Sequence, residues 1–247
     1  GPTLLPASGL QITFHEAAPQ PACAPLLLLL LAPFQELLEK ALLLDRTTGR
    51  CTRRLRTGQN RIDARRPRRQ RALRRRLVEP ILRGLQARPP LQLGGEIRRG
   101  KWSLVLLSTY LAGEDAGGLG PARLASLRKS LAANADQHVL VAMHHHPLPM
   151  GSTWLDGVAL RDAEAFWEII DANRQVRAVV CGHVHQASDR ERNGVRFLST
   201  PSTCAQFLPG STFFALDERP PGLRWLELHA DGRIETEVAW VPQRASA

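Results

Sequence analysis

Two apolar segments that each end in a cluster of histidines constrain this chain more than any other feature. The first segment, 138–143, is followed directly by the triplet 144–146, and the second, 176–180, is followed by Cys181-Gly182-His183-Val184-His185. Short apolar runs are typical of buried strands in α/β proteins, whose functional side chains gather where strands end. Neutral imidazole is a common ligand of transition metals. The pattern therefore predicts one metal site assembled from two strands.

Composition sets wide limits on the fold. The chain has 247 residues, 43% of them hydrophobic, which is enough for the core of one large or two small α/β domains. Its four cysteines form no C-x-x-C pair, which predicts a reducing, cytoplasmic location. The apolar run at 26–31 is shorter than the about 20 residues that a membrane span needs, and it lacks the flanks of a signal peptide. We expect neither a membrane segment nor export.

The second part of the chain, 101–247, is patterned as a mixed α/β structure. Amphipathic helices are predicted at 121–135 and 162–172. Strands are predicted at 103–108, 138–143, 178–181, 195–199, 212–216, 223–229 and 234–240. Asn193-Gly194 and Asp231-Gly232 are strong hairpin signals between the later strands. A βαβ section followed by antiparallel strands is a coherent plan for a domain.

The first part, 1–100, is poorly patterned. A strand is predicted at 10–13 and helices at 33–44 and 73–85, but about half of the residues at 50–76 are arginine. Such a segment cannot contribute to a core, and we expect it to be disordered. A shifted reading frame in a GC-rich gene accounts for this composition. Natural divergence and an artificial sequence remain alternatives.

From about Leu91 to Val241 the chain resembles the bacterial 3′,5′-cyclic-AMP phosphodiesterases, a branch of the calcineurin-like metallophosphoesterases. The resemblance rests on six motifs, which lie at 113–120, 144–149, 152–156, 181–185, 200–204 and 226–232. It implies a four-layer α/β/β/α sandwich with a two-metal site at the strand ends. It also implies metal-dependent hydrolysis of 3′,5′-cyclic AMP, or of a related cyclic nucleotide, to the 5′-monophosphate.

The resemblance further implies roles for individual residues. His145 and His183 would bind one metal and His185 the other, with iron or manganese as the expected kind of ion. His144 and His146 would orient the histidine between them. Candidate contacts with the small-molecule cyclic nucleotide are His144, Ser202, Thr203 and Cys204. For the last three, packing of a strand end is an equally good interpretation.

The family's carboxylate ligands have no counterparts in this sequence. Phe14, Gln59 and Ser108 stand where the family has aspartates, and no Gly-Asn-His-Asp segment occurs. No catalytic residue is therefore identified. Neutral imidazoles without a bridging carboxylate should hold two cations poorly, although they suffice for one. His15 is expected to be a solvent-facing loop residue rather than a ligand, and His229 to be structural.

Two other functions stay open from the sequence. One is hydrolysis of a different phosphodiester or phosphomonoester by the same kind of site. The other is a non-catalytic relic with weak metal or nucleic-acid binding. The arginine block at 50–76 has no interleaved aromatic residues, so we do not expect nucleic acid to be a partner. The glycine-rich loop at 113–120 lacks the lysine of a phosphate-binding loop. The oligomeric state is not predicted.

Overall fold

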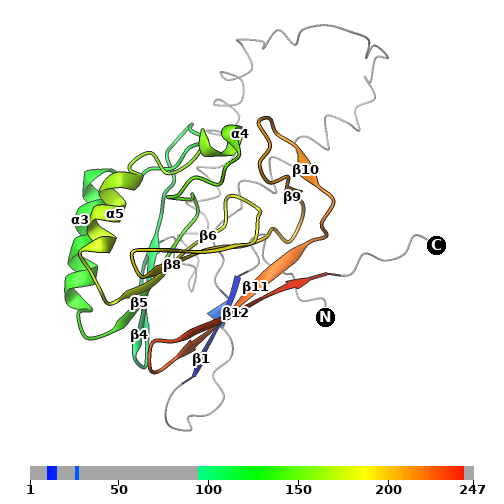
Figure 1. Cartoon of the computed structure of the whole chain (residues 1–247). Helices are drawn as coiled ribbons and strands as arrows, with labels where there is room; N and C mark the ends of the chain where they lie inside the picture. Colours follow the sequence, from blue (N-terminus) through cyan, green and yellow to red (C-terminus); the bar gives the residue numbers. More distant parts are fainter. Residues whose placement is uncertain (1–9, 16–25, 28–93, 242–247) are drawn as a thin grey trace, which may run out of the picture. The chain divides into compact units, whose positions relative to one another are not determined.

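A six-stranded sheet carries the two histidine clusters. The computed structural model describes residues 10–15, 26–27 and 94–241, all of which except 112–114 belong to one compact unit. The sheet has the order β3-β4-β5-β6-β8-β7. Its strands are β3 (Gly95–Arg99), β4 (Trp102–Leu107), β5 (His138–Met143), β6 (Val176–Cys181), β8 (Val195–Ser199) and β7 (Ser188–Arg192). The middle strands β4, β5, β6 and β8 are parallel, and β3 and β7 pair antiparallel at the edges (Figure 1).

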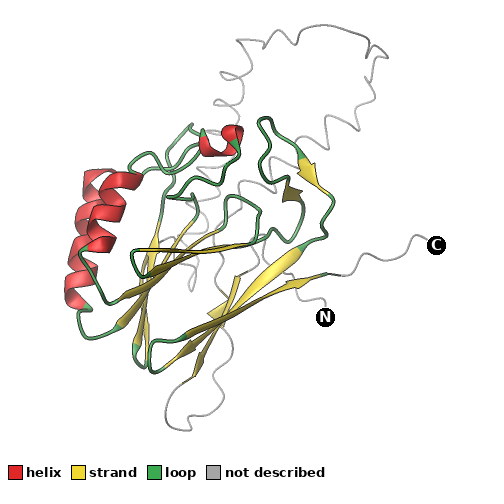
Figure 2. Cartoon of the chain, in the orientation of Figure 1, coloured by secondary structure: helices red, strands yellow, loops and turns green. Residues whose placement is uncertain are grey.

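The middle strands are apolar because both faces of the sheet are covered. Helices α3 (Gly120–Ala133) and α5 (Ala163–Asp171) pack on one face, as Figure 2 shows. Their buried residues, among them Leu127, Leu131, Phe166 and Ile169, join Val139, Val141 and Val179 from the sheet in one core. Pro121 lies in the first turn of α3, where its missing N–H costs nothing.

A four-stranded sheet, in the order β12-β11-β1-β2, covers the other face. Its strands are β1 (Leu10–His15), β2 (Leu26–Leu27), β11 (Gly222–His229) and β12 (Ile234–Trp240). In β1 and β11 alternate residues are buried, so that Leu10, Ile12, Leu226 and Leu228 pack against the six-stranded sheet. The predicted α/β class is confirmed, with helices and two sheets as successive layers. A fourth layer would lie outside the described residues.

Most of the predicted elements in the second part of the chain are confirmed to within two residues at their ends. The strand predicted at 212–216 is wrong: β10 is Leu216–Asp217, and it pairs only with β9 (Gln206–Phe207). The aromatic residues of this segment, Phe213 and Phe214, are 80% and 60% exposed, and Phe214 contacts the rings of Trp154 and Phe207. The edge strands β3 and β7 and the short helix α4 (Thr153–Asp156) were not predicted.

The predictions for the first part of the chain are tested only in part. The strand predicted at 10–13 is confirmed as β1. The helices predicted at 33–44 and 73–85 and the arginine block at 50–76 lie outside the described residues. The division of the chain near residue 100 stays a prediction. No helix in the described part of the chain is long and apolar enough to cross a membrane.

Candidate metal centre

The histidine clusters meet because their strands are parallel neighbours. The last residue of β5, Met143, lies opposite the last residue of β6, Cys181. The chain therefore leaves both strands at the same edge of the sheet. The backbone N–H groups of Gly182 and His183 both donate to the carbonyl of His144, at 3.2 and 3.0 Å. These two bonds fix one loop against the other.

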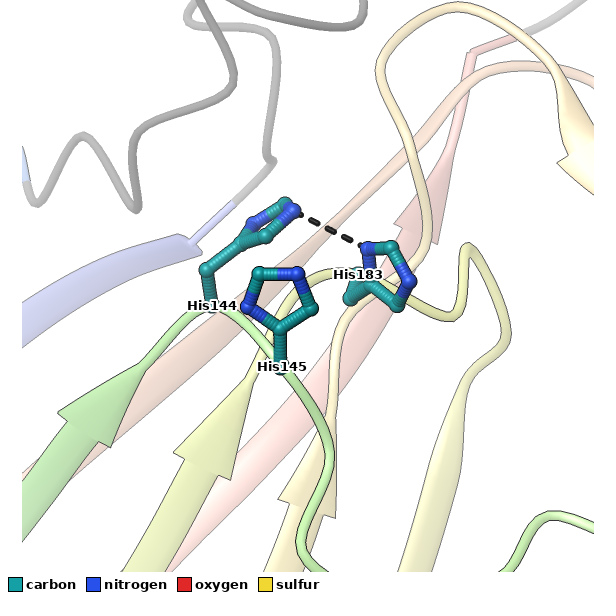
Figure 3. Close-up of side chains that lie close together, drawn as sticks. All are labelled: His144, His145 and His183. Atoms are coloured by element: carbon teal, nitrogen blue, oxygen red, sulfur yellow. Dashed lines mark hydrogen bonds between the residues drawn. The ribbon is translucent and has the colours of Figure 1, made fainter. Parts of the chain in front are cut away.

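Three imidazoles converge at this edge of the sheet. Possible ligand nitrogens of His144, His145 and His183 all lie within 4.8 Å of one another. Figure 3 shows the rings facing one another, with Nδ1 of His183 3.0 Å from Nε2 of His144. The ring centroids of His145 and His183 are 4.5 Å apart. The structure thus brings together His145 and His183 and adds His144. Binding of one metal by His145 and His183 stays a prediction.

Two nitrogens of this cluster are candidate ligand atoms. Nε2 of His183 and Nδ1 of His144 are buried and have no hydrogen-bond partner within the described part of the chain. A buried polar atom without a partner is costly and calls for an explanation. Nδ1 of His183 and Nε2 of His144 share one hydrogen, so only one of the two outer nitrogens has a lone pair. Because a neutral imidazole nitrogen with a lone pair is a good metal ligand, a bound cation would satisfy that atom.

His145 is held by protein groups on both sides of its ring. The Thr109 hydroxyl lies 2.7 Å from Nδ1 and accepts a bond from the His145 backbone N–H at 3.3 Å. The backbone carbonyl of Asp115 lies 3.1 Å from Nε2. A carbonyl can only accept, so Nε2 carries the hydrogen and Nδ1 accepts from Thr109. In this tautomer neither nitrogen presents a lone pair to a metal, so binding requires His145 to exchange one of these partners.

His185 lies on the same loop as His183 but outside the three-ring cluster. Its backbone has a φ of 50°, a left-handed conformation that is uncommon for a residue other than glycine. Its Nδ1 donates to the carbonyl of Ala205 at 2.7 Å, and its ring stacks on Phe207 with centroids 4.2 Å apart. Donation from Nδ1 to a carbonyl leaves Nε2 as the coordinating atom, which is the usual arrangement of a metal-ligating histidine.

Burial keeps these histidines neutral. It lowers the pKa of His145 to about 3 and that of His185 to about 4, the latter against the opposing effect of the bond to Ala205. Burial, together with the neighbouring histidines, holds the pKa values of His144 and His183 well below 6.5. Neutral rings do not repel a cation and need not lose a proton before binding it.

His146 faces away from a ligand role. It is fully buried, and its Nε2 lies 3.5 Å from a carboxylate oxygen of Asp156. The Asp156 carboxylate also accepts from the backbone N–H groups of Met150 and Gly151 at 2.7 and 3.0 Å. These contacts close the loop after β5. Both ring nitrogens of His146 are buried without a hydrogen-bond partner among the described residues, and its predicted role of orienting His145 stays a prediction.

The turn at 200–204, predicted to contact substrate, makes structural contacts. The backbone of Ser202 bonds through both its N–H and its carbonyl to the buried amide of Gln206, at 2.9 and 2.7 Å. The Ser202 hydroxyl accepts from the N–H of Cys204 at 3.0 Å. These bonds place the carbonyl of Ala205, which holds His185. Substrate contact by His144, Ser202, Thr203 and Cys204 stays a prediction.

The end of β1 lies at the opposite edge of the molecule from the cluster. Strand β11 begins beside Ser202, whose carbonyl accepts from the Gly222 N–H, and ends at His229, whose carbonyl accepts from the Trp102 side chain at 2.7 Å. Trp102 begins β4, which runs toward Thr109. Because β1 is parallel to β11, it also runs away from the cluster. Phe14, which stands where the family has an aspartate, therefore lies away from the cluster and packs against the core between the sheets.

Carboxylates are absent from the three-ring cluster, as far as the described residues extend. Gln59 lies outside those residues. Ser108, which stands where the family has an aspartate, offers a hydroxyl group instead of a carboxylate. His15 is exposed, as predicted, but it is the last residue of β1 rather than part of a loop. The cluster therefore fits one cation and lacks the anionic bridge that two cations require.

Sequence reasoning missed three groups that hold the site. Thr109 supports His145, and Phe207 supports His185. Gly117 lies so close to His145 that a Cβ there would stand 2.4 Å from the ring. Only Gly117 lay in a motif that the sequence had singled out, at 113–120. No spacing rule would connect Thr109 or Phe207 to histidines 36 and 22 positions away.

Part of the chain is homologous to curated bacterial cyclic-nucleotide phosphodiesterases, which confirms the resemblance. It is 43% identical over 142 residues to the 3′,5′-cyclic adenosine monophosphate phosphodiesterase CpdA of Pseudomonas aeruginosa. It is 47% identical over 137 residues to CpdA of Vibrio vulnificus, and 36% over 166 residues to that of Haemophilus influenzae. These matches cover 58%, 56% and 67% of this chain and 52%, 50% and 61% of the relatives. The chain thus spans about half the length of the first two.

Similarity to solved structures is weaker. A dimetal phosphatase from Danio rerio matches with a TM-score of 0.31 and 19% identity, over 44% of this chain and 34% of the other. The GAP50 anchor of the inner membrane complex of Plasmodium matches with a TM-score of 0.34 and 14% identity, over 50% of this chain and 42% of the other. The chain matches no protein-family model.

Proposed function

We propose that this chain, part of which is homologous to the bacterial 3′,5′-cyclic AMP phosphodiesterases, hydrolyses 3′,5′-cyclic AMP or a related cyclic nucleotide to the 5′-monophosphate. One observation carries the proposal. Three imidazoles, buried in His145 and half-buried in His144 and His183, converge at a strand end, with Nε2 of His183 and Nδ1 of His144 unpartnered among the described residues. The scattered cysteines favour the cytoplasm as the location.

A divalent cation, iron or manganese by resemblance, is the cofactor that the proposal requires. His183 would bind it through Nε2, with the ring hydrogen on Nδ1 donated to Nε2 of His144, and His145 would join once its ring gives up Thr109 or Asp115. His185 is set to offer Nε2, because its Nδ1 is bonded to Ala205. When bound, the cation would neutralise charge on the phosphate and polarise it toward attack by water.

The protein groups around the cluster have separate tasks. Thr109 and the Asp115 carbonyl set the orientation of His145. Ala205 and Phe207 hold the His185 ring on its two sides. Rings fixed in this way lose little freedom on binding a cation, which favours affinity. The low pKa values keep the imidazoles in the neutral form that ligation needs.

A second candidate is favoured by one observation, the lack of a carboxylate in the cluster among the described residues. Without an anionic bridge the site would hold a single cation and stabilise a phosphate dianion less than a pair does. The chain would then be a metal-binding relic with no turnover. No observation in the described part of the structure favours the other phosphoester hydrolyses that the sequence left open.

Hydrolysis assays separate the candidates. The full chain, with Mn²⁺ or Fe²⁺ added, is tested on cyclic AMP and on bis(p-nitrophenyl) phosphate. The proposal predicts turnover that disappears in His183→Ala and persists in His138→Ala, a histidine at the other end of β5. Metal binding with no turnover on either compound supports the relic. Turnover unchanged in His183→Ala contradicts the proposed site.

A further inference from the structure

A second set of metal-ligating side chains lies on the outer face of the four-stranded sheet. It consists of His15 at the end of β1 and of Glu227 and His229 near the end of β11. One ligand atom from each lies within 4.8 Å of the other two. This edge of the molecule is the opposite one from the histidine cluster, since both strands run away from it.

The strand register explains why these side chains meet. His15 is paired directly with His229 across the parallel strands, and Glu227 precedes His229 by two residues. Alternation therefore places all three on one face, while Leu226 and Leu228 point into the core. On the other side of β11, Glu235 is paired with Glu227 and adds a second carboxylate to the same face.

The side chains already interact closely. Nε2 of His15 lies 3.1 Å from a carboxylate oxygen of Glu227, and the rings of His15 and His229 stack with centroids 4.7 Å apart. Nε2 of His229 lies 3.5 Å from the Glu235 carboxylate. The backbone beneath is fixed, since the Trp102 side chain donates to the carbonyl of His229 at 2.7 Å. Coordination of one ion by both histidines requires one ring to turn out of this stack, because a metal lies in the plane of the imidazole that binds it.

A cationic group of the protein currently shares the site. The Arg233 guanidinium lies 3.2 Å from Nδ1 of His229 and forms an ion pair with Glu235. A guanidinium cannot accept a hydrogen bond, so in this contact Nδ1 acts as the acceptor. The lone pair that a metal would use thus faces a positive charge. The Arg233 side chain is 54% exposed, which leaves it room to withdraw.

We infer that His15, Glu227 and His229 form a surface site for one divalent transition-metal ion of the Zn²⁺, Ni²⁺ or Cu²⁺ class. Two imidazoles and a carboxylate are the donor set that such ions prefer, and hard cations such as Mg²⁺ select oxygen-only sets. Glu235 or water completes the coordination. The inference uses none of the groups of the histidine cluster, so it stands apart from the proposed hydrolase. It revises the expectation that His15 is no ligand and His229 merely structural.

Zinc titration of the full chain tests the site. Binding is followed by calorimetry, and the imidazole nitrogen signals of His15 and His229 by NMR, which separates them from the histidine cluster. We expect zinc to shift the imidazole nitrogen signals of both His15 and His229. We also expect His15→Ala and Glu227→Gln each to weaken this zinc binding at least tenfold. Glu237→Gln, which removes an exposed acid of β12 outside the set, should leave it unchanged.

Removal of the competing charge gives an independent test. Arg233→Gln is expected to tighten zinc binding at these residues severalfold, because the metal no longer displaces a guanidinium. Zinc affinity that is unaltered in His15→Ala and Glu227→Gln would overturn the inference, as would the absence of zinc-dependent shifts at His15 and His229. Equal or weaker binding in Arg233→Gln counts against it as well.

Discussion

His145 is the residue whose surroundings decide how the candidate centre works. Both of its ring nitrogens are engaged, Nδ1 by Thr109 and Nε2 by the carbonyl of Asp115. It is 8% exposed, and burial lowers its pKa to about 3, so the ring remains neutral well below physiological pH. The protein therefore fixes both the tautomer and the orientation of this ring before any ligand arrives.

Replacement of Thr109 tests that role. Thr109→Val keeps the side-chain shape and removes the hydroxyl, which leaves Nδ1 and the backbone N–H of His145 without their buried partner. We expect a loss of about 1–3 kcal/mol in the free energy of unfolding, measured by urea denaturation. Thr109→Ser retains the hydroxyl and should recover most of this loss. A Thr109→Val variant as stable as the parent would show that the contact is unimportant.

The loop between β4 and α3 and the turn between β8 and β9 are the elements that shape the centre. The loop brings Gly117 against the His145 ring, and the turn brings Ala205 to His185. The turn is supported by Gln206, a fully buried amide that also donates to Pro220 at 3.0 Å. The two elements contact different histidines, so a substitution in each tests a different side of the centre.

Gly117→Ala should disturb the His145 side of the centre. The added Cβ would stand 2.4 Å from Cγ of the His145 ring, a separation that the packed site cannot accept without movement. We expect a loss of about 1–3 kcal/mol in stability by thermal unfolding, together with weaker metal binding. Gly157→Ala, whose Cβ would meet only ordinary contacts at 3.4 Å, is the matched control. Equal stability of the two variants would contradict the assigned contact.

Gln206→Leu should disturb the His185 side. It removes the partners of the Ser202 backbone and of the Pro220 carbonyl, at a cost of about 1–3 kcal/mol for each buried group left unsatisfied. Thermal unfolding measures the loss. Leu208→Ala, at a 43% exposed position two residues further on, should change stability by no more than about 0.5 kcal/mol. A Gln206→Leu variant that unfolds at the same temperature as the parent would contradict the stabilising role of the Gln206 amide.

At the scale of the whole molecule, the buried histidines make stability depend on pH. They titrate near pH 6.5 when unfolded and well below it when folded. Between these values the unfolded chain binds more protons, so the free energy of unfolding falls as the pH falls. The stability they contribute is fully present above pH 6.5 and is lost progressively toward pH 4 and below.

Urea denaturation of the metal-free chain between pH 7 and pH 5 tests this dependence. This pH window lies above the ordinary pKa range of carboxyl groups, so histidines dominate the change of stability within it. We expect a steady loss of stability over this range, and a shallower slope in His183→Ala, which lacks one of the buried rings. A flat profile in the parent chain would contradict the neutral, buried state of the cluster.

The sequence predicts the strands and helices of the molecule better than the side chains that hold the candidate site in place. Strands β5 and β6 were predictable because they are continuous apolar runs, and their parallel pairing was enough to expect His145 and His183 together. Thr109 and Gln206 were not predictable, because their partners are backbone groups or rings that only the fold brings near. The segment 212–216 was misread because its aromatic residues Phe213 and Phe214 are exposed and Phe214 contacts Trp154 and Phe207 instead of joining a sheet. The direction of β1, which carries His15 away from the cluster, also required the structure.

Bound-metal content tests the central claim most directly, that the histidine cluster is a metal centre. The full chain, its His183→Ala variant and its His15→Ala variant are dialysed against Mn²⁺ and analysed for metal by elemental analysis. The account predicts one ion per chain in the parent and in His15→Ala, and its loss in His183→Ala. Equal manganese content in the parent and in His183→Ala, or no bound metal in any of the three, would contradict it.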